Sequence, residues 1–364
     1  MIVLYILALL LSFYILAKVC DEYFVESLDI ISKKWKMSSD AAGATLMAVG
    51  SSAPELFVAL FAIISPEKGS EALGVGNIVG SAIFNILVIT GAVGLVKKSK
   101  LAWRPVMRDV FFYSVAVALL IGVFFIGSFG VLETIVFLLV YVAYVIVVVY
   151  WRKMFPPNKI ELELAQLEED TETEKNNSTE EPEKQAAWKK IFMPIDFILD
   201  KLFPSMKHFY IVFFISIIII AGISWVLVES AVEISHILNI PSVIVGLTVL
   251  AVGTSVPDLF SSIIVAKENK GGMAVSNGIG SNIFDILVGL GLPFLIMILI
   301  SGVEIPAEDS NITISSFILF GTVGVLLITF ILNKWKIGKG VGLFFIGIYV
   351  AYVVWQILQA VEIL

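Results

Sequence analysis

The sequence predicts an all-α membrane protein with ten transmembrane helices in two inverted five-helix repeats, with broken helices at the midplane. The composition is the first indication, because hydrophobic residues make up 59% of the 364 residues and charged residues only 15%, as is typical of polytopic membrane proteins. A spanning helix needs about 20 mostly apolar residues. Runs of this kind occur at 2–20, 40–64, 71–95, 106–127, 131–151, 207–229, 240–266, 272–300, 311–332 and 341–363.

These runs divide the chain into a first repeat at 1–151, a connecting segment at 152–206 and a second repeat at 207–364. The run Ile2–Ala17 lacks a basic flank and a small-residue cleavage site, so we expect a first spanning helix and no cleaved signal. The single cysteine, Cys20, excludes an intramolecular disulfide.

The basic residues predict the orientation. If the N-terminus is outside, 23 of the 24 Lys and Arg residues fall on the inner side, and Lys68 is the exception. We therefore expect an integral protein of the plasma membrane with both termini outside and the 152–206 loop in the cytoplasm.

The connecting segment has two parts. Glu161–Glu183 holds ten acidic residues, one lysine and no aromatic residue, which predicts a disordered linker. Its acids lack the spacing of an EF-hand loop, so a solvated linker is favoured over a calcium sensor. Trp188–Leu202 mixes apolar and basic residues and predicts an amphipathic helix at the inner membrane interface, interrupted near Pro194.

An internal repeat dominates both halves. Gly43–Phe57 (GATLMAVGSSAPELF) recurs 203 residues later as Gly246–Phe260 (GLTVLAVGTSVPDLF), and Asn77–Leu87 recurs as Asn277–Leu287. The repeated regions extend over 43–91 and 246–293. The second copy lies five predicted helices after the first, and this odd offset makes the copies run antiparallel through the membrane. Inverted repeats with Gly/Pro-interrupted helices predict a secondary transporter with its site where the repeats meet.

The repeated stretches place acids at membrane depth. A carboxylate there costs about 2.5–3.5 kcal/mol on insertion scales and usually marks an ion or substrate path, which makes Glu55 and Asp258 the first candidates. Pro54 and Pro257 follow the small residues and break each helix. The break frees carbonyls near Ala48 and Val49, and near Ala251 and Val252, which only a polar cavity or a cation would satisfy.

The remaining candidate ligands are also oxygen donors. They are Ser51 and Ser52 beside Glu55, Thr254 and Ser255 beside Asp258, and the i,i+4 pairs Ser81 with Asn85 and Ser281 with Asp285. Hard oxygen ligands select calcium, sodium, potassium or magnesium, and an adaptable cage favours calcium over magnesium.

The charges of the site predict exchange. Glu55 and Asp258 balance one divalent or two monovalent cations. Asp285 adds a third charge that must be protonated or matched by a further monovalent cation.

Structural alternatives exist for several of these residues. The hydroxyls can bond to their own helices, and Asn85 and Asp285 can serve as neutral bridges between helices. We expect Asn77, Asn277 and Asn282 to have structural or gating roles. For Glu229, Glu233 and His236 a solvated outer rim is favoured over an ion-entry vestibule.

The motifs resemble a known family. Gly50–Glu55 (GSSAPE), Gly80–Asn85 (GSAIFN), Gly253–Asp258 (GTSVPD) and Gly280–Asp285 (GSNIFD) are similar to the alpha repeats of the cation/calcium exchanger superfamily. Within it, they most resemble sodium/calcium exchangers of the potassium-dependent type. The resemblance implies that Glu55, Asp258 and the carbonyls of Ala48 and Ala251 bind calcium. It implies that Ser52, Thr254, Ser255, Ser81, Ser281, Asn85 and Asp285 complete the sodium sites. It leaves potassium dependence through Asp285 open.

The predicted function is therefore an antiporter, not an enzyme, that exports calcium against sodium entry by alternating access. By analogy with the family, the first and sixth helices slide against a fixed four-helix site. A calcium/proton exchanger is the alternative, and an intramembrane aspartyl protease or a channel is disfavoured. The expected partners are calcium, sodium, potassium or protons and the lipid bilayer. No cofactor and no nucleic acid is expected, and the sequence does not predict an oligomeric state.

Overall fold

The computed structural model describes residues 2–35, 46, 48–65, 70–156, 189–267, 271–307 and 310–360. The first half contains α1 (Ile2–Val19), η1 (Cys20–Val25), α2 (Glu26–Lys34), α4 (Ala48–Ser51), α5 (Ala53–Ile64), α6 (Ser70–Phe84), η3 (Asn85–Ile89), α7 (Thr90–Val96), β1 (Ser99–Lys100), α8 (Trp103–Ile126), β2 (Ser128–Phe129) and α9 (Val131–Met154). The connecting segment contains α11 (Lys189–Leu202) and η4 (Met206–His208). The second half contains α12 (Phe209–Leu238), α13 (Ser242–Val245), η5 (Gly246–Leu250), α14 (Ala251–Thr254), α15 (Val256–Lys267), α16 (Gly271–Phe284), η6 (Asp285–Leu290), α17 (Gly291–Ser301), β3 (Ile305–Pro306), α18 (Ser310–Leu332), β4 (Lys336–Ile337) and α19 (Lys339–Ala360).

The helical membrane architecture is confirmed. Among the described residues, eight helical segments are long and apolar enough to span a bilayer, and Ser242–Thr254 with Val256–Lys267 forms a ninth that bends by 40°. The expected span at 40–64 is described in full only from Ala48 onward, as α4 and α5. The expected disordered stretch, Glu161–Glu183, lies outside the described residues.

Two helices are longer than their apolar runs predicted. The first continues from residue 20 to Lys34, because i,i+4 ion pairs such as Lys18–Glu22 (2.8 Å) extend it past the apolar run. The helix α12, expected to end near 229, continues to Leu238 and ends at Asn239, which adopts the left-handed conformation with φ 53°. Glu229, Glu233 and His236 therefore lie within α12.

The structure contradicts the expected interruption at Pro194. Pro194 lies inside α11, which is one continuous helix. A proline costs a helix one hydrogen bond and a steric clash, and here α11 is also held from outside by α1. Tyr14 stacks on Phe192 with 4.0 Å between ring centroids, and the hydroxyls of Tyr14 and Tyr23 donate to Asp196 and Asp200 at 2.6 Å.

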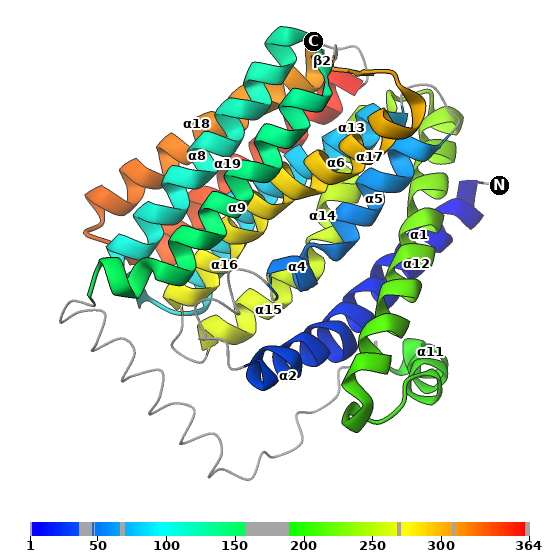
Figure 1. Ribbon diagram of the computed structural model, residues 1–364, viewed down its shortest axis with the longest axis horizontal. Coiled ribbons are helices and arrows are strands. Elements are labelled where there is room, and N and C mark those ends of the chain that lie inside the picture. The colour runs from blue at the N-terminus through cyan, green and yellow to red at the C-terminus, as the bar shows by residue number, and fades with distance from the viewer. Residues whose placement is uncertain are drawn as a thin grey trace.

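The helices form two groups. The long helices α1 and α12 pack side by side along one flank of the bundle, with α11 near the end away from the N-terminus, whereas α8, α9, α18 and α19 lie on the opposite flank (Figure 1). The repeated segments lie between these groups. One apolar cluster joins α1, η1, α2 and α12 to α5, and a larger cluster joins α6, α8, α16, α17, α18 and α19.

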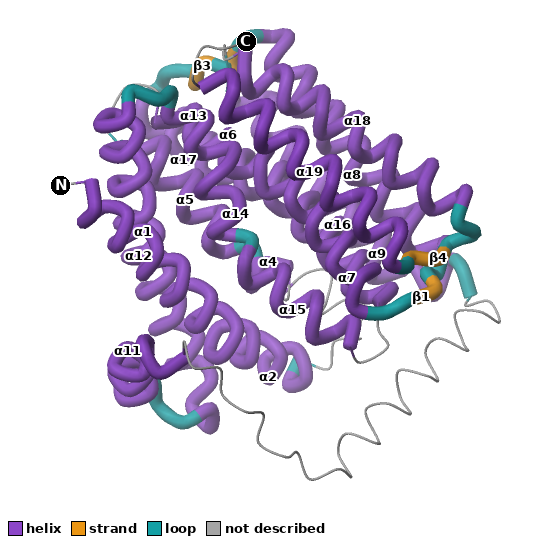
Figure 2. The backbone as a smooth tube through the Cα atoms, turned by 180° about the vertical axis from the view of Figure 1, so that it is seen from behind, coloured by secondary structure: helices purple, strands orange, loops and turns teal. Residues whose placement is uncertain are grey.

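Two very short β-ladders connect the halves. β1 pairs with β4 and β2 pairs with β3, both antiparallel. β1 and β2 flank α8 in the first half, and β3 and β4 flank α18 in the second half. The strand before each helix pairs with the strand after the other helix, so each strand pairs with the opposite half. The ladders lie at opposite ends of the bundle (Figure 2), which is the arrangement expected of inverted repeats.

Candidate cation site

The helix breaks lie at equivalent residues of the two repeats. Ser52 separates α4 from α5 with φ −93° and ψ 7°, and Ser255 separates α14 from α15 with φ −88° and ψ 0°. Each break precedes its proline by two residues. Ser255 N–H donates to the Ala251 carbonyl at 3.3 Å, so this carbonyl keeps one lone pair for another partner.

The helix that follows the broken helix in each repeat is called here its partner helix: α6–η3–α7 in the first repeat and α16–η6–α17 in the second. The two partner helices also correspond to each other. Each changes from α- to π-helix immediately after a phenylalanine, at Asn85 in the first repeat and at Asp285 in the second. π-Bulges occur frequently at functional sites. The sequence analysis did not predict these bulges, although the Phe84-Asn85 and Phe284-Asp285 motifs mark their positions.

The broken helix of each repeat meets the partner helix of the other. Ser51 and Ser52 lie 3.1 and 3.2 Å from the Ser281 hydroxyl, and Ser81 lies 2.6 Å from the Ser255 hydroxyl. Ser52 and Ser255 are equivalent positions, as are Ser81 and Ser281, so the two cross-contacts correspond to each other under the repeat. Four elements that are distant in the sequence therefore converge on one buried centre.

Glycines allow this close approach. A Cβ added at Gly80 would lie 2.7 Å from the Ala251 Cβ, and one at Gly76 would lie 2.8 Å from the Val243 carbonyl oxygen. Any larger residue would separate α6 from the α13–η5–α14 segment.

Three buried carboxylates lie in this centre. Glu55 and Asp285 are 0% exposed and Asp258 is 1% exposed, and they are close enough for their negative charges to interact. Ser81 donates to Glu55 Oε1 at 3.4 Å. Glu55 Oε2 and both carboxylate oxygens of Asp258 and Asp285 form no hydrogen bond within 3.5 Å among the described residues, although Ser51, Ser281 and Asn85 lie near Asp258 and Ser52 lies near Asp285. Five buried acceptor oxygens without donors fit a site whose partner is a cation.

Another buried acid shows the contrast. Asp109 of α8 is 1% exposed, but Arg108 Nε donates to it at 2.8 Å and the Tyr144 hydroxyl at 3.3 Å. This carboxylate is balanced by a protein cation. The three central acids form no ion pair with a basic side chain in the described part of the chain.

Two asparagines take a larger part than the sequence analysis expected. Asn85 Nδ2 donates to Asn282 Oδ1 at 2.9 Å, and Asn282 Nδ2 donates to the Ala82 carbonyl at 3.0 Å. Thr254 donates to Asn77 Oδ1 at 3.3 Å and also to the Leu250 carbonyl at 3.1 Å. Asn282 thereby orients Asn85, whose Oδ1 is buried and has no donor among the described residues. The repeated motif identified Asn77, Asn85 and Asn282, but it did not predict the residues with which they form hydrogen bonds.

Within the described residues, no three acidic, histidine or cysteine side chains converge on one metal position. A cation here must therefore also use hydroxyl, amide and carbonyl oxygens, which is the mixed oxygen set that calcium and sodium accept.

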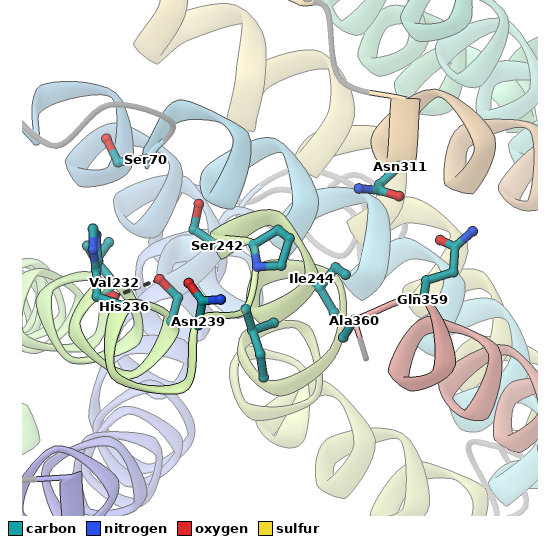
Figure 3. Close-up of a pocket in the computed structure, with 12 residues that line it drawn as sticks. Ser70, Val232, His236, Asn239, Ser242, Ile244, Asn311, Gln359 and Ala360 are labelled. Carbon is teal, nitrogen blue, oxygen red and sulfur yellow. Dashed lines mark hydrogen bonds between the residues drawn. The ribbon is translucent and has the colours of Figure 1, made fainter. Parts of the chain in front are cut away.

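A separate cavity of about 500 Å³ lies at the end of α12 (Figure 3). His236, Asn239, Ser242, Asn311 and Gln359 contribute to its lining. His236 thus lies at a polar hollow, whereas Glu55, Asp258 and Asp285 do not line it.

Comparison with known proteins gives a consistent result. The family described as sodium/calcium exchanger protein matches residues 5–150 and 208–358. Human sodium/potassium/calcium exchanger 5 is 30% identical over 94% of this chain and 80% of its own length. Mouse sodium/potassium/calcium exchanger 4 is 28% identical over 98% of this chain and 81% of its own length.

A solved structure of the sodium–calcium exchanger NCX_Mj, soaked with Na⁺ and Sr²⁺, has the same fold. It aligns with a TM-score of 0.59 and 25% sequence identity, over 97% of this chain and 99% of that one. The chain belongs to the sodium/calcium exchanger protein family.

Proposed function

We propose that the protein is an antiporter that exports Ca²⁺ from the cell in exchange for entering Na⁺. The observation that carries this proposal is the buried centre in which Glu55, Asp258 and Asp285 have unpaired oxygens and the hydroxyls of both repeats surround them. A membrane-embedded site that is acidic, rich in oxygen ligands and built from two repeats suits cations that are bound in turn from either side.

Glu55 and Asp258 are the proposed Ca²⁺ ligands, with the Ala48 and Ala251 carbonyls. They occupy equivalent positions of the two repeats and together carry the two charges that one Ca²⁺ balances. The hydroxyls are the proposed Na⁺ ligands, together with Asn85 and Asp285. These are Ser51, Ser52, Ser81, Thr254, Ser255 and Ser281.

The third carboxylate requires a further cation. Ca²⁺ alone leaves one negative charge at the site, and an unpaired buried charge costs several kcal/mol. Asp285 is fully buried and has no donor among the described residues. We therefore propose that a monovalent cation accompanies Ca²⁺. The names of the sodium/potassium/calcium exchangers make K⁺ the first candidate.

The protein is an integral membrane protein, and the distribution of Lys and Arg supports a plasma-membrane orientation with both termini outside and the 152–206 loop inside. The side-by-side packing of α1 and α12 along one flank of the bundle suits a two-body mechanism. In this mechanism the α1–α12 pair moves against the centre and exposes the site to one side at a time.

The test is radiocalcium uptake by proteoliposomes that contain the purified full chain. An outward Na⁺ gradient should drive Ca²⁺ uptake, and removal of K⁺ should reduce it. Liposomes without protein and liposomes with equal Na⁺ on both sides are the controls. Uptake that follows a pH gradient and ignores Na⁺ would replace the proposal with calcium/proton exchange.

A further inference from the structure

The first membrane helix, made of α1, η1 and α2, packs on one glycine of each repeat. A Cβ at Gly50 would lie 2.8 Å from Leu28 Cδ1 and 3.2 Å from Val25 Cγ2. At the equivalent Gly253, an added Cβ would collide with the ring of Phe13. The segment of α1 and η1 between Phe13 and Val25 therefore passes directly over the centre of the repeats.

The direction of the broken helices places the acids along this segment. In the proposed orientation, α4 and α5 run outward, so Gly50 lies on the inner side of Glu55. The chain from α14 to α15 runs inward, so Gly253 lies on the outer side of Asp258. Asp258 thus lies on the inner side of the centre. Its depth in the membrane is that of the part of the first helix just before Val25.

Asp21 occupies this part of the helix. It precedes Val25 by four residues and Leu28 by seven, so it shares the face of the helix that contacts Gly50. Its neighbours Cys20 and Phe24 are buried, whereas Asp21 is exposed. The negative charge of Asp258 is close enough to act on Asp21.

Asp21 also differs from two other acids of its helix, Glu22 and Asp29. Glu22 forms an ion pair with Lys18 at 2.8 Å, and Asp29 forms one with Lys33. No hydrogen bond or ion pair of Asp21 is found with any part of the chain that the structure describes. An ionised carboxylate at this depth is stable only in contact with water or a cation.

We propose that Asp21 is the acidic residue of the inner entrance to the cation site, where it attracts cytoplasmic cations and transfers them to Asp258. The proposal rests on the proposed function, because it assigns a role in cation exchange. Asp21 belongs to the helix that slides, whereas Asp258 belongs to the fixed centre. Movement of α1 therefore changes the distance between the two carboxylates and couples entry to the conformational change.

Electrostatics predicts an effect that depends on ion charge and on the side of the membrane. A carboxylate about 10 Å from an ion in water raises the local concentration of a monovalent cation roughly twofold and of a divalent cation roughly fourfold. Asp21→Asn should therefore raise the apparent KM for Ca²⁺ about fourfold and for Na⁺ about twofold on the cytoplasmic side. The KM on the external side should not change.

The experiment compares inside-out and right-side-out membrane vesicles that contain the full chain. Initial rates of radiocalcium uptake are measured in each at several Ca²⁺ and Na⁺ concentrations. Glu26→Gln is the matched control, because it removes the same charge from an exposed residue of the same helix that lines the cavity formed with Asp200 and Phe203. Asp21→Glu should retain the wild-type KM.

The outcomes separate the two proposals. A wild-type protein that exchanges no Ca²⁺ for Na⁺ refutes the proposed function itself. If the wild type is active, an unchanged KM in Asp21→Asn, or an equal change on both sides, refutes the role of Asp21 alone. If Asp21→Asn does not fold, Asp21→Ser is measured in the same way, because it also removes the charge: a rise in KM confined to the cytoplasmic side supports the role of Asp21, and an unchanged KM refutes it.

Discussion

Gly80→Ala tests whether the close approach of the two repeats builds the site. The added Cβ would lie 2.7 Å from the Ala251 Cβ and 2.8 Å from the Leu247 carbonyl carbon. Carbon atoms in contact are normally about 3.5–4.0 Å apart, so α6 must move by roughly 1 Å. The hydrogen bond between Ser81 and Ser255, now 2.6 Å long, would then stretch to about 3.6 Å and be lost.

The energetic terms predict a net loss of stability. Overpacking costs about 1–3 kcal/mol and the lost hydrogen bond about 1 kcal/mol, whereas alanine gains up to about 1 kcal/mol over glycine in a helix. The free energy of unfolding should fall by about 1–3 kcal/mol, which lowers Tm by roughly 1–4 °C for a chain of this length. Sodium-driven calcium uptake should fall more steeply, because the displaced hydroxyls are proposed ligands.

The assay is thermal unfolding of the detergent-purified protein, followed by uptake in proteoliposomes. Gly122→Ala is the matched control, because it lies in α8 and its added Cβ meets nothing within 4 Å. That variant should keep the wild-type Tm or raise it slightly. Equal Tm and equal uptake in Gly80→Ala and Gly122→Ala would refute the reasoning.

Three further predictions concern side chains. Glu55→Gln and Asp258→Asn should each abolish calcium uptake while Tm changes little, and retained uptake by either variant would remove that residue from the site. Asp285→Asn should alter the dependence of uptake on K⁺ or Na⁺ more than the KM for Ca²⁺, and an unchanged ion dependence would leave Asp285 a structural role. Tyr23→Phe removes the 2.6 Å hydrogen bond to Asp200, so trypsin should cleave α11 several-fold faster than in wild type, whereas Tyr5→Phe should not change the cleavage rate.

Much of the fold was predictable because the motif repeats. Two copies of one pattern, offset by five helices, predicted antiparallel broken helices. The structure places the breaks at the equivalent residues Ser52 and Ser255. The length of an apolar run predicted the helix ends less well, because a helix can continue beyond the bilayer. There, ion pairs and capping residues, not hydropathy, determine where the helix ends. The first helix therefore continues to Lys34 through its charged part.

The candidate site was predictable in its composition but not in its contacts. Sequence spacing put Ser52 near Glu55 and Ser281 near Asp285, yet the observed hydrogen bond joins Ser52 to Ser281 across the repeats. Likewise, the local sequence does not show which asparagine of α16, Asn277 or Asn282, forms the hydrogen bond with Asn85. Such pairs depend on how α4 and α16 pack, and only the three-dimensional structure supplies that information.

The repeats are equivalent in their backbone but not in their charge. The serine contacts, the helix breaks and the π-bulges all obey the repeat, whereas Asn85 corresponds to Asp285. Asn85 is fixed by its bond to Asn282, which in turn bonds to the Ala82 carbonyl, whereas the oxygens of Asp285 have no donor among the described residues. The divalent ion can therefore be shared by the symmetric pair Glu55 and Asp258, while the third charge lies on one side only. Because that charge has no counterpart in the first repeat, the proposed function assigns the cation that balances it a position beside Asp285, distinct from that of Ca²⁺, and Asp285→Asn tests this assignment.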